Sequence, residues 1–297
     1  MKIIEKINDL HIDLDQIKTS GKSIGFVPTM GALHYGHLSL IEQARNTCDV
    51  VVVSIFVNPA QFGPKEDLEK YPRDLDKDAQ FCKEENVDIL FYPSDSEMYD
   101  FGFDQLKITY PTYTQVLCGK FRPGHFDGVL LIMAKLLNIV DPHFCFMGHK
   151  DGQQLILVEK LVKDLNFRTE IIGCPTLREA SGLAMSSRNI YLSEPERELA
   201  EMVNKALETI VSGNLTQVET LISTEKKKLR DCGLEVQYLS LVDTSNLREV
   251  SSIGIGKFML CVAVLCGSTR LIDNYLITQY EEGKIEIDRG RTLKDAL

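Results

Sequence analysis

The sequence predicts a two-domain α/β protein, in which a doubly wound parallel sheet precedes a second, smaller α+β domain. The first two-thirds of the 297 residues alternate short apolar runs with longer amphipathic ones. Residues 50–57 are nearly all β-branched, as in a strand that is buried on both faces. The alternation stops near Gly173, where β-rich runs follow two amphipathic stretches. Alternating strands and helices predict parallel strands joined by right-handed crossovers.

The first domain is predicted to cover residues 1–175, and its elements follow from the period of its apolar residues. Strands are expected over residues 24–27, 50–57, 88–91, 143–146 and 168–172. Helices are expected over residues 38–48, 72–86, 128–140 and 153–165. Because every pair of successive strands is separated by a helical or long connection, we expect these strands to run parallel.

The second domain is predicted over residues 176–297, with its boundary near residues 173–180. The sequence Ser193-Glu-Pro-Glu196 is a capping-box start for a helix to about residue 212, and a second helix is expected over 216–230. The β-rich runs 235–242, 257–265 and 270–277 predict a small antiparallel sheet. The charged tail, residues 281–297, is expected to be loosely attached.

Composition and apolar patterning disfavour nucleic-acid-binding, secreted and membrane-spanning proteins. The chain has 43 acidic and 33 basic residues, a net charge of −10, which disfavours generic nucleic-acid binding without excluding a nucleotide substrate in a locally positive pocket. Its eight cysteines are scattered and show no C-x-x-C spacing. Residues 1–18 lack the apolar core of a signal peptide, and the longest apolar run, 128–140, is too short to span a bilayer. These features predict a soluble, cytoplasmic protein with reduced thiols and neither membrane nor nucleic-acid partners.

The segment after the first predicted strand, residues 28–37, is the first candidate ligand site. It carries Gly31, His34 and His37 and leads into a helix. Glycines let the backbone approach an anion, and the free N–H groups of a helix start favour phosphate. Two imidazoles three residues apart suit the stabilisation of charge on a reacting phosphate. A turn in which the histidines only cap the helix remains an alternative, and a zinc site lacks a third ligand.

Further candidates lie at other junctions. Asn58 and Gln61 follow the second strand and suit recognition of hydroxyl and carboxylate groups, although an ordinary Asn-Pro loop is an alternative. Arg122 and His125 lie in a Gly/Pro-rich loop before a helix, and Lys150 lies at a strand-to-helix junction, where it could meet phosphate. Residues 185–189, Met-Ser-Ser-Arg-Asn, suit a mobile phosphate clamp or a plain linker.

Together these motifs resemble the pantoate–β-alanine ligase family over about residues 20–275. The resemblance is carried by the blocks PTMGALHYGHLSLI, SIFVNPAQFGPKEDLEKYPRDLDKD, FRPGHFDGV, FMGHKDGQQ, REASGLAMSSRN and GSTRLIDN. It implies a Rossmann-like first domain and an ATP-dependent ligase. Pantoate would form pantoyl adenylate and pyrophosphate, and β-alanine would then displace AMP to give pantothenate. It also implies Mg²⁺ as a cofactor and a homodimer. The two-histidine motif is similar to that of the wider nucleotidyltransferase superfamily.

The resemblance also implies roles for individual residues. The catalytic residues would be His34, His37, Lys150, Ser186, Ser187 and Arg188. The residues that border ATP would be Pro28, Met30, Gly31, His34, His37, Gly148, Lys150, Asp151, Leu177, Met185, Ser186, Ser187 and Arg188. Pantoate or β-alanine would meet Met30, Asn58, Gln61, Phe62, Tyr71, Arg122, His125 and Gln154. Asp78 is the candidate metal ligand.

A few positions depart from the family's pattern. Tyr35 stands where Glu is common, and His149 stands where Glu or Gln is common. Ser181 replaces a common Asp, and Leu177 replaces a frequent Val. We expect Ser181 to loosen support of the phosphate clamp and His149 to add pH sensitivity near ATP. Two alternatives remain open from the sequence: a nucleotidyltransferase with another acid acceptor, and a non-catalytic nucleotide-binding module.

Overall fold

The chain folds into two compact units in the computed structural model, which describes residues 1–64, 66–100, 102 and 106–293. The first unit comprises Met1–Gln115, Arg122–Gly148 and Gln153–Cys174. The second comprises Val116–Phe121, His149–Gly152 and Pro175–Leu297. The chain thus passes finally into the second unit at Pro175, and two short earlier segments also belong to that unit.

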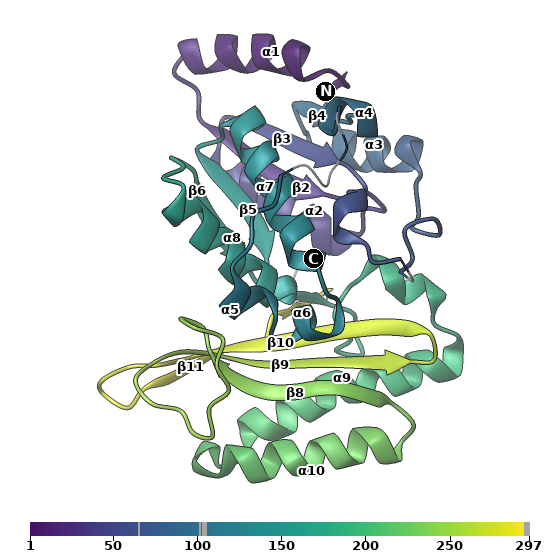
Figure 1. Ribbon diagram of the computed structural model, residues 1–297, viewed down its shortest axis with the longest axis vertical. Coiled ribbons are helices and arrows are strands. Elements are labelled where there is room, and N and C mark those ends of the chain that lie inside the picture. Colours follow the sequence, from purple (N-terminus) through teal and green to yellow (C-terminus); the bar gives the residue numbers. More distant parts are fainter. Residues whose placement is uncertain (65, 101, 103–105, 294–297) are drawn as a thin grey trace. The chain divides into compact units, whose positions relative to one another are not determined.

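The first unit is built on a six-stranded parallel sheet (Figure 1). Its strands are β1 (Lys2–Ile4), β2 (Ile24–Thr29), β3 (Val50–Ile55), β4 (Ile89–Phe91), β5 (Phe144–Gly148) and β6 (Glu170–Cys174). The order across the sheet is β1-β4-β3-β2-β5-β6, and every pairing is parallel. The prediction of a doubly wound parallel sheet is therefore confirmed. The edge strand β1 was not predicted, because its two apolar residues lie between Lys2 and Glu5 and form no longer apolar run.

Helices connect these strands. The longer ones are α1 (Ile7–Thr19), α2 (Tyr35–Thr47), α3 (Leu75–Glu84), α7 (His125–Val140) and α8 (Gly152–Asp164). The shorter ones are η1 (Pro59–Gln61), α4 (Asp95–Met98) and α5 (Pro111–Thr114). Helix α3 begins later than predicted because Asp74 caps it, its Oδ1 accepting the Lys77 N–H at 3.1 Å. Helix α7 follows Gly124, whose φ of 82° lies in the left-handed region that favours glycine.

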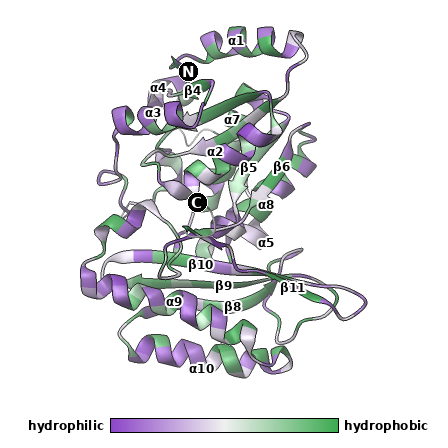
Figure 2. Ribbon diagram, turned by 180° about the vertical axis from the view of Figure 1, so that it is seen from behind, coloured by the Kyte–Doolittle hydropathy of each residue, from purple (hydrophilic) through white to green (hydrophobic). Residues whose placement is uncertain are grey.

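The strand order places the candidate motifs at the switch point of the sheet. From β2 the chain builds outward through β3 to β4, and it later returns to add β5 on the other side of β2. In open α/β sheets, ligands bind beyond the carboxyl ends of the strands at such a point. The segments after β2, β3 and β5 all leave from this edge. The sheet is apolar, as Figure 2 shows, and all six residues of β3 are buried.

The second unit holds a four-stranded antiparallel sheet and two long helices. Its strands are β8 (Glu235–Asp243), β9 (Gly256–Cys266), β10 (Thr269–Gln279) and β11 (Ile285–Asp288), in the order β11-β10-β9-β8. Helices α9 (Glu194–Ser212) and α10 (Val218–Asp231) contribute to one apolar core with β8, β9 and β10. The predicted capping box is present, since the Glu196 carboxylate accepts the Ser193 N–H at 2.9 Å. The predicted antiparallel sheet with two helices is confirmed.

Smaller elements complete this unit: α6 (Cys118–Phe121), η2 (His149–Asp151), β7 (Leu177–Arg178), η3 (Ser187–Tyr191), η4 (Leu215–Gln217) and β12 (Arg291–Thr292). The expectation of a loosely attached tail was wrong for residues 285–292. Strand β11 pairs with β10, and β12 pairs with β7. A charged segment gives no apolar period, yet backbone hydrogen bonds to a sheet edge hold it. Residues 294–297 of this prediction lie outside the described residues.

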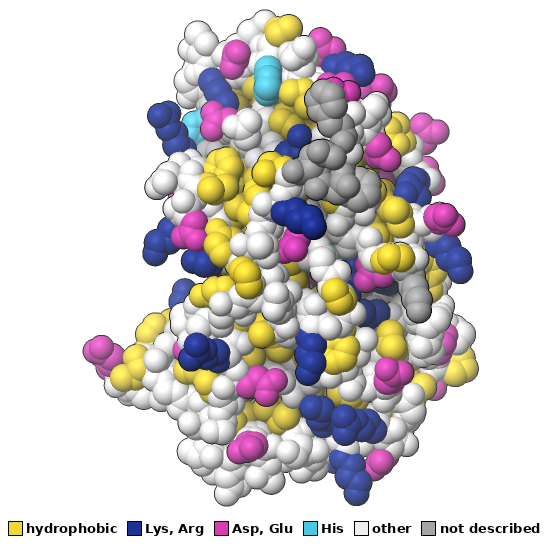
Figure 3. Space-filling view, in the orientation of Figure 1, with side chains coloured by type: hydrophobic (Ala, Val, Ile, Leu, Met, Phe, Trp, Pro, Cys, Tyr) yellow, Lys and Arg dark blue, Asp and Glu magenta, His cyan; other side chains and the backbone are white. Residues whose placement is uncertain are grey.

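Three further features are the distribution of surface charge, the state of the cysteines and the apolar length of the helices. Acidic and basic side chains are interspersed on the face shown in Figure 3. All eight cysteines are free, and only Cys232 among them is not fully buried. No helix in the described part of the chain has the length and apolar character needed to cross a membrane.

Candidate functional site

The turn that contains Gly31 follows β2, and the buried carboxylate of Asp78 holds it in place. Gly31 has a φ of 82°, and a Cβ there would lie 2.9 Å from Asp78 Oδ2 and from Ile55 Cγ2. The two Asp78 oxygens accept the N–H groups of Ala32 at 2.9 Å and Leu33 at 2.7 Å. Burial raises the pKa of Asp78, and these hydrogen bonds oppose that effect. Asp78 therefore fixes the path of the turn that leads to α2.

This geometry corrects the expectation that Asp78 binds metal. Its side chain is 2% exposed, and each oxygen already accepts a backbone N–H, so it is not presented to a bound ion. Within the described ranges, no group of three or more His, Cys, Asp and Glu side chains is arranged to hold a metal. Asp78 is instead a positioning residue for the turn.

His34 and His37 lie together at the N-terminus of α2. Their ring centroids are 4.1 Å apart, because His34 is the cap residue and His37 lies one turn later. His34 Nδ1 accepts the Gly36 N–H at 3.1 Å, and His37 Nδ1 accepts the His34 N–H at 3.4 Å. With both Nδ1 atoms accepting, the proton of each neutral ring is placed on Nε2. The pair therefore caps the start of α2, and its expected role at phosphate stays a prediction.

A buried amide network follows β3. Asn58 is 1% exposed and donates through Nδ2 to Gln61 Oε1 at 3.0 Å and to the Gly128 carbonyl at 3.1 Å. Its Oδ1 accepts the Tyr99 O–H at 2.7 Å and the Ala60 N–H at 3.3 Å. Since Gln61 Oε1 is taken by Asn58, the Gln61 amide is oriented so that its Nε2 lies 3.1 Å from Met30 Sδ.

These contacts change the role expected of Asn58. All of its polar atoms are bound to protein, so it positions Gln61 instead of meeting substrate directly. Sequence reasoning missed Tyr99, which lies in a separate loop, and Gly128, at which a Cβ would overlap the Ala60 carbonyl. A glycine inside a strongly apolar helix was the available signal for this close approach.

Arg122 and His125 form a second polar group next to Gln61. The guanidinium makes two hydrogen bonds to Glu66, Nε–Oε1 at 2.6 Å and Nη2–Oε2 at 2.7 Å. Arg122 Nη1 lies 2.8 Å from His125 Nε2, and His125 Nδ1 lies 2.8 Å from the Gln61 carbonyl oxygen. Because Arg donates at Nε2 and the carbonyl accepts at Nδ1, the neutral ring carries its proton on Nδ1. The sequence did not single out Glu66.

The Glu66 carboxylate is strongly held in its charged form. Burial alone would raise its pKa, but hydrogen bonds and charge from Arg122 outweigh burial and lower the pKa to about 2. The ion pair neutralises Arg122, which makes it a structural support for the backbone of Gln61. Arg122 and His125 were expected at the substrate, and the structure places both in this support network.

The other predicted residues of the first unit lie around these groups. Phe62 and Tyr71 form an edge-to-face pair with centroids 6.0 Å apart, and Tyr71 is buried. Pro28 lies within β2, Gly148 ends β5, and Gln154 lies half-buried in the first turn of α8. The unit thus brings Met30, Asn58 and Gln61 into direct contact and places the histidine pair on the adjoining turn.

Lys150 and Asp151 lie side by side on η2 in the second unit, with Nζ 3.6 Å from Oδ1. Asn274 of β10 holds their backbone by donating from Nδ2 to the carbonyls of His149 and Lys150 at 2.8 and 2.9 Å. Gly152 is needed beside them, since a Cβ there would lie 2.5 Å from Met259 Sδ. These contacts come from β9 and β10, which the motif alone did not indicate.

Residues 177–189 form a hairpin that carries the predicted phosphate clamp. The Met185 N–H donates to the Leu177 carbonyl at 3.0 Å, and Ser186 Oγ accepts the Arg188 N–H at 3.3 Å. Asn189 closes the turn by donating to Glu179 Oε1 at 2.9 Å and to the Ala184 carbonyl at 3.1 Å. Leu177 is buried and Met185 is half-buried. The hairpin therefore brings Leu177, Met185 and residues 186–188 into one segment.

Comparisons with known proteins bear on this arrangement. The family model "Pantoate-beta-alanine ligase" matches residues 2–276. A pantothenate synthetase of Carboxydothermus hydrogenoformans is 47% identical, with 93% of this chain and 99% of the relative covered. One of Acetivibrio thermocellus is 45% identical with the same coverage.

Solved structures agree with these relatives. Pantothenate synthetase from Thermus thermophilus is similar at 39% identity and a TM-score of 0.85, covering 92% of this chain and 98% of that one. The ligase from Francisella tularensis, solved with an ATP analogue described as "Beta-gamma ATP" and with β-alanine, is similar at 38% identity and a TM-score of 0.77, covering 92% and 97%.

Proposed function

The chain belongs to the pantoate–β-alanine ligase family, and from this premise we propose that it joins pantoate to β-alanine in two ATP-dependent steps. In the first step, a pantoate carboxylate oxygen attacks the α-phosphorus of ATP, and pyrophosphate leaves. In the second, the neutral amine of β-alanine attacks the acyl carbon of pantoyl adenylate, AMP leaves with the electron pair of the broken C–O bond, and the nitrogen loses one proton to solvent. The resulting amide is pantothenate.

The observation that carries the proposal is the histidine pair on a glycine turn, with an oriented amide beside it. Both rings have Nδ1 committed to a backbone N–H, which places Nε2–H as the donor toward an anion. Charge develops on phosphate oxygens during adenylation, and donors that are already oriented stabilise it without a reorganisation cost. His34 and His37 are thus proposed to stabilise the phosphates during this step by donating hydrogen bonds from Nε2.

Pantoate is proposed to bind near Met30 and Gln61. The Gln61 Nε2, oriented by Asn58, is a donor suited to a hydroxyl or carboxylate oxygen. Met30, Phe62 and Tyr71 supply apolar surface for a branched carbon chain, and Gln154 adds a second amide. Holding the carboxylate and the α-phosphorus in line is the main requirement of the first step.

Further residues are proposed to bind ATP. Lys150 provides a point charge for phosphate and Asp151 a carboxylate for ribose hydroxyls. Leu177 offers backbone groups to adenine, and Met185, Ser186, Ser187 and Arg188 offer hydroxyls and a guanidinium to the phosphates. The solved Francisella tularensis relative was described with an ATP analogue and β-alanine, which supports ATP and β-alanine as ligands of this chain.

Of three further assignments, Mg²⁺ and the homodimer rest on the resemblance, and the location rests on the composition of the chain. Mg²⁺ is proposed to enter with ATP, because magnesium in such sites keeps several waters and binds mainly substrate phosphates. No step is assigned to it, since Asp78 does not fit a ligand role. A homodimer and a cytoplasmic location are proposed as well, and the free thiols are compatible with a reducing compartment.

The proposal is tested by measuring pyrophosphate and AMP release from ATP and Mg²⁺. With pantoate alone we expect one pyrophosphate per active site, and with β-alanine we expect sustained release of both products. His37→Ala should lower the rate by 10²-fold or more, on the order found when one preorganised donor is removed. His11→Ala, on the exposed surface of α1, is the matched control and should match the wild type. Pyrophosphate release without pantoate dependence would retire the proposal.

A further inference from the structure

Residues 285–292 form a C-terminal strap within the second unit. The match to the family model ends at residue 276, so the strap lies beyond it. Strand β11 adds to the edge of β10 through Ile285–Asp288, and β12 pairs in parallel with β7, Arg291 opposite Leu177. The strap therefore joins the edge of the antiparallel sheet to β7, the strand that begins the phosphate-clamp hairpin.

The first attachment point of the strap is the backbone around β7. The Arg291 N–H donates to the Thr176 carbonyl at 2.8 Å, and Arg178 Nε donates to the Arg289 carbonyl. Gly290 has a φ of 80°, and a Cβ there would overlap the Thr176 carbonyl oxygen. The contact thus depends on a glycine, because no side chain fits between the strap and β7.

The second attachment point is the segment that carries Lys150. Asp288 Oδ2 lies 2.6 Å from His149 Nδ1, and Asp288 Oδ1 accepts the Gly290 N–H at 2.8 Å. One carboxylate therefore links the turn of the strap to the residue directly before Lys150. The same segment is also held by Asn274, which donates to the His149 and Lys150 carbonyls.

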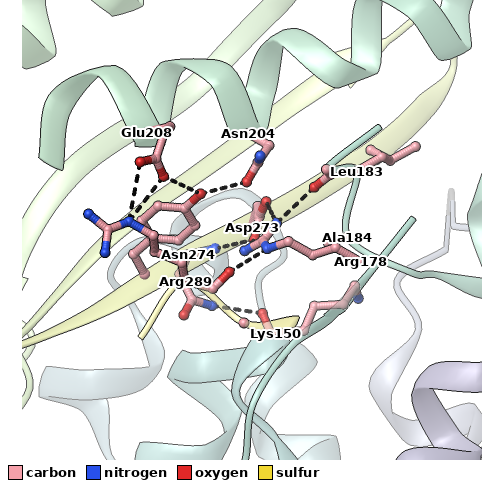
Figure 4. A network of polar contacts seen from close by, with 12 residues as sticks. Lys150, Arg178, Leu183, Ala184, Asn204, Glu208, Asp273, Asn274 and Arg289 are labelled. Atoms are coloured by element: carbon pink, nitrogen blue, oxygen red, sulfur yellow. Dashed lines mark hydrogen bonds and ion pairs between the residues drawn. The ribbon is translucent and has the colours of Figure 1, made fainter. Parts of the chain in front are cut away.

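A buried ion pair ties the β7 attachment to β10, as Figure 4 shows. Arg178 is 3% exposed and makes two hydrogen bonds to Asp273, at 2.6 and 2.9 Å, while its guanidinium lies 5.1 Å from the Tyr275 ring centroid. Glu208 accepts from the Tyr275 hydroxyl and from Arg289 Nε, each at 3.2 Å. Because Arg178 belongs to β7 and Arg289 to the strap, this network fixes the strap relative to the hairpin.

We propose that the strap positions the Lys150 segment and β7 for ATP, with Asp288 as a positioning residue that acts through His149 and with Gly290 as its point of close approach. The proposal rests on the function proposed above, in which Lys150 and Leu177 meet ATP. We therefore expect a loosened strap to raise the KM for ATP, while pantoate binding and the histidine pair stay unchanged.

Two variants loosen the strap by different routes. Asp288→Asn removes the charge opposite His149, and Gly290→Ala forces the strap away from Thr176. We expect each to raise the KM for ATP three- to tenfold, with kcat and the KM for pantoate within twofold of the wild type. In the same proteins without substrate, amide hydrogen exchange should accelerate in residues 149–152 and 176–189.

Glu286→Gln is the matched control on the same strand. The Glu286 carboxylate contacts Lys284 and Tyr280, within its own hairpin, so kinetics and exchange should stay at wild-type values. Unchanged KM for ATP and unchanged exchange in Asp288→Asn and Gly290→Ala would overturn the proposal. If the wild type instead shows no pantoate-dependent turnover, the proposed ligase function fails, and the exchange measurement still decides whether the strap orders these segments.

Discussion

At the scale of single residues, the first unit separates the groups proposed to meet a ligand from the groups that hold them in place. Gln61 and the histidine pair are oriented by neighbours whose polar atoms are already bound within the protein. Asn58 illustrates this arrangement, because it accepts two hydrogen bonds and donates two. The rigidity of such a fully satisfied amide keeps the Gln61 side chain in one orientation.

Replacing Asn58 tests this role. Asn58→Ala would leave the Tyr99 hydroxyl and the Gly128 carbonyl without their buried partner, at a cost of about 1–3 kcal/mol in the free energy of unfolding. It would also release Gln61, so we expect kcat/KM for pantoate to fall at least tenfold. Steady-state kinetics and chemical denaturation would measure the two effects.

Tyr99→Phe is the control for that variant, because it removes one donor to Asn58 Oδ1 and leaves the Asn58–Gln61 hydrogen bond in place. Its kcat/KM should stay within about threefold of the wild type. Equal losses of kcat/KM in both variants would contradict a specific role for the Asn58–Gln61 contact.

At the scale of elements, α7 and η1 meet at one glycine. Asn58 donates to the Gly128 carbonyl, and a Cβ on Gly128 would overlap the Ala60 carbonyl, so helix and turn are in backbone contact. This close approach explains why a long apolar helix carries a glycine in its first turns. It also sets the position of the residues that orient Gln61.

Gly128→Ala should force η1 and α7 apart. Overpacking of this kind costs about 1–3 kcal/mol in unfolding free energy, and the shift should also lower kcat/KM for pantoate. Thermal and chemical denaturation with kinetics would measure both effects. Gly254→Ala is the control, because nothing lies within 4 Å of a Cβ at that position. A Gly128→Ala protein as stable as Gly254→Ala would show that the contact relaxes freely.

Comparison of the elements with the sequence shows which helices, strands and site residues could be predicted. The longer strands were predicted because buried β-branched runs and apolar periods reveal them, and α9 because its capping box lies in the sequence. Strands β1, β7, β11 and β12 were missed, because β7 and β12 have only two residues, and the charged residues within and beside β1 and β11 hide an apolar pattern. The equally short β4 was predicted from its uninterrupted apolar run. The site motifs were recognised by residue type, but Glu66 and Tyr99 were not, because their partners lie far away along the chain.

At the scale of the whole molecule, several described carboxyl groups are held in their charged form. The pKa of Glu97 is lowered by hydrogen bonds from Ile7 and Lys6, and that of Asp288 by its hydrogen bond to His149. The pKa of Glu66 falls from 4.5 to about 2. A lowered carboxyl pKa stabilises the fold above the unfolded pKa, and this contribution is lost as pH falls toward the folded value.

We therefore expect the free energy of unfolding to decrease as pH falls from 5 to 2. Glu66→Gln should be less stable than the wild type at pH 7. The difference in unfolding free energy between the two proteins should narrow by on the order of 3 kcal/mol as pH falls from 5 to 2. Denaturation at a series of pH values measures the gap. Glu69→Gln, an exposed carboxyl nearby, should show no comparable narrowing. A gap that stays constant between pH 6 and 2 would contradict the role of the Glu66–Arg122 pair.

Protein synthesis delivers β7 to the folding chain long before its partner β12. Leu177 pairs with Arg291, so β7 cannot form this pairing until nearly the whole second unit has left the ribosome. The first unit can assemble its sheet during translation, because all six of its strands precede Pro175. The proposed ATP-binding segments of the second unit are thus completed last, and a nascent chain that stalls before residue 285 lacks the strap that fixes them.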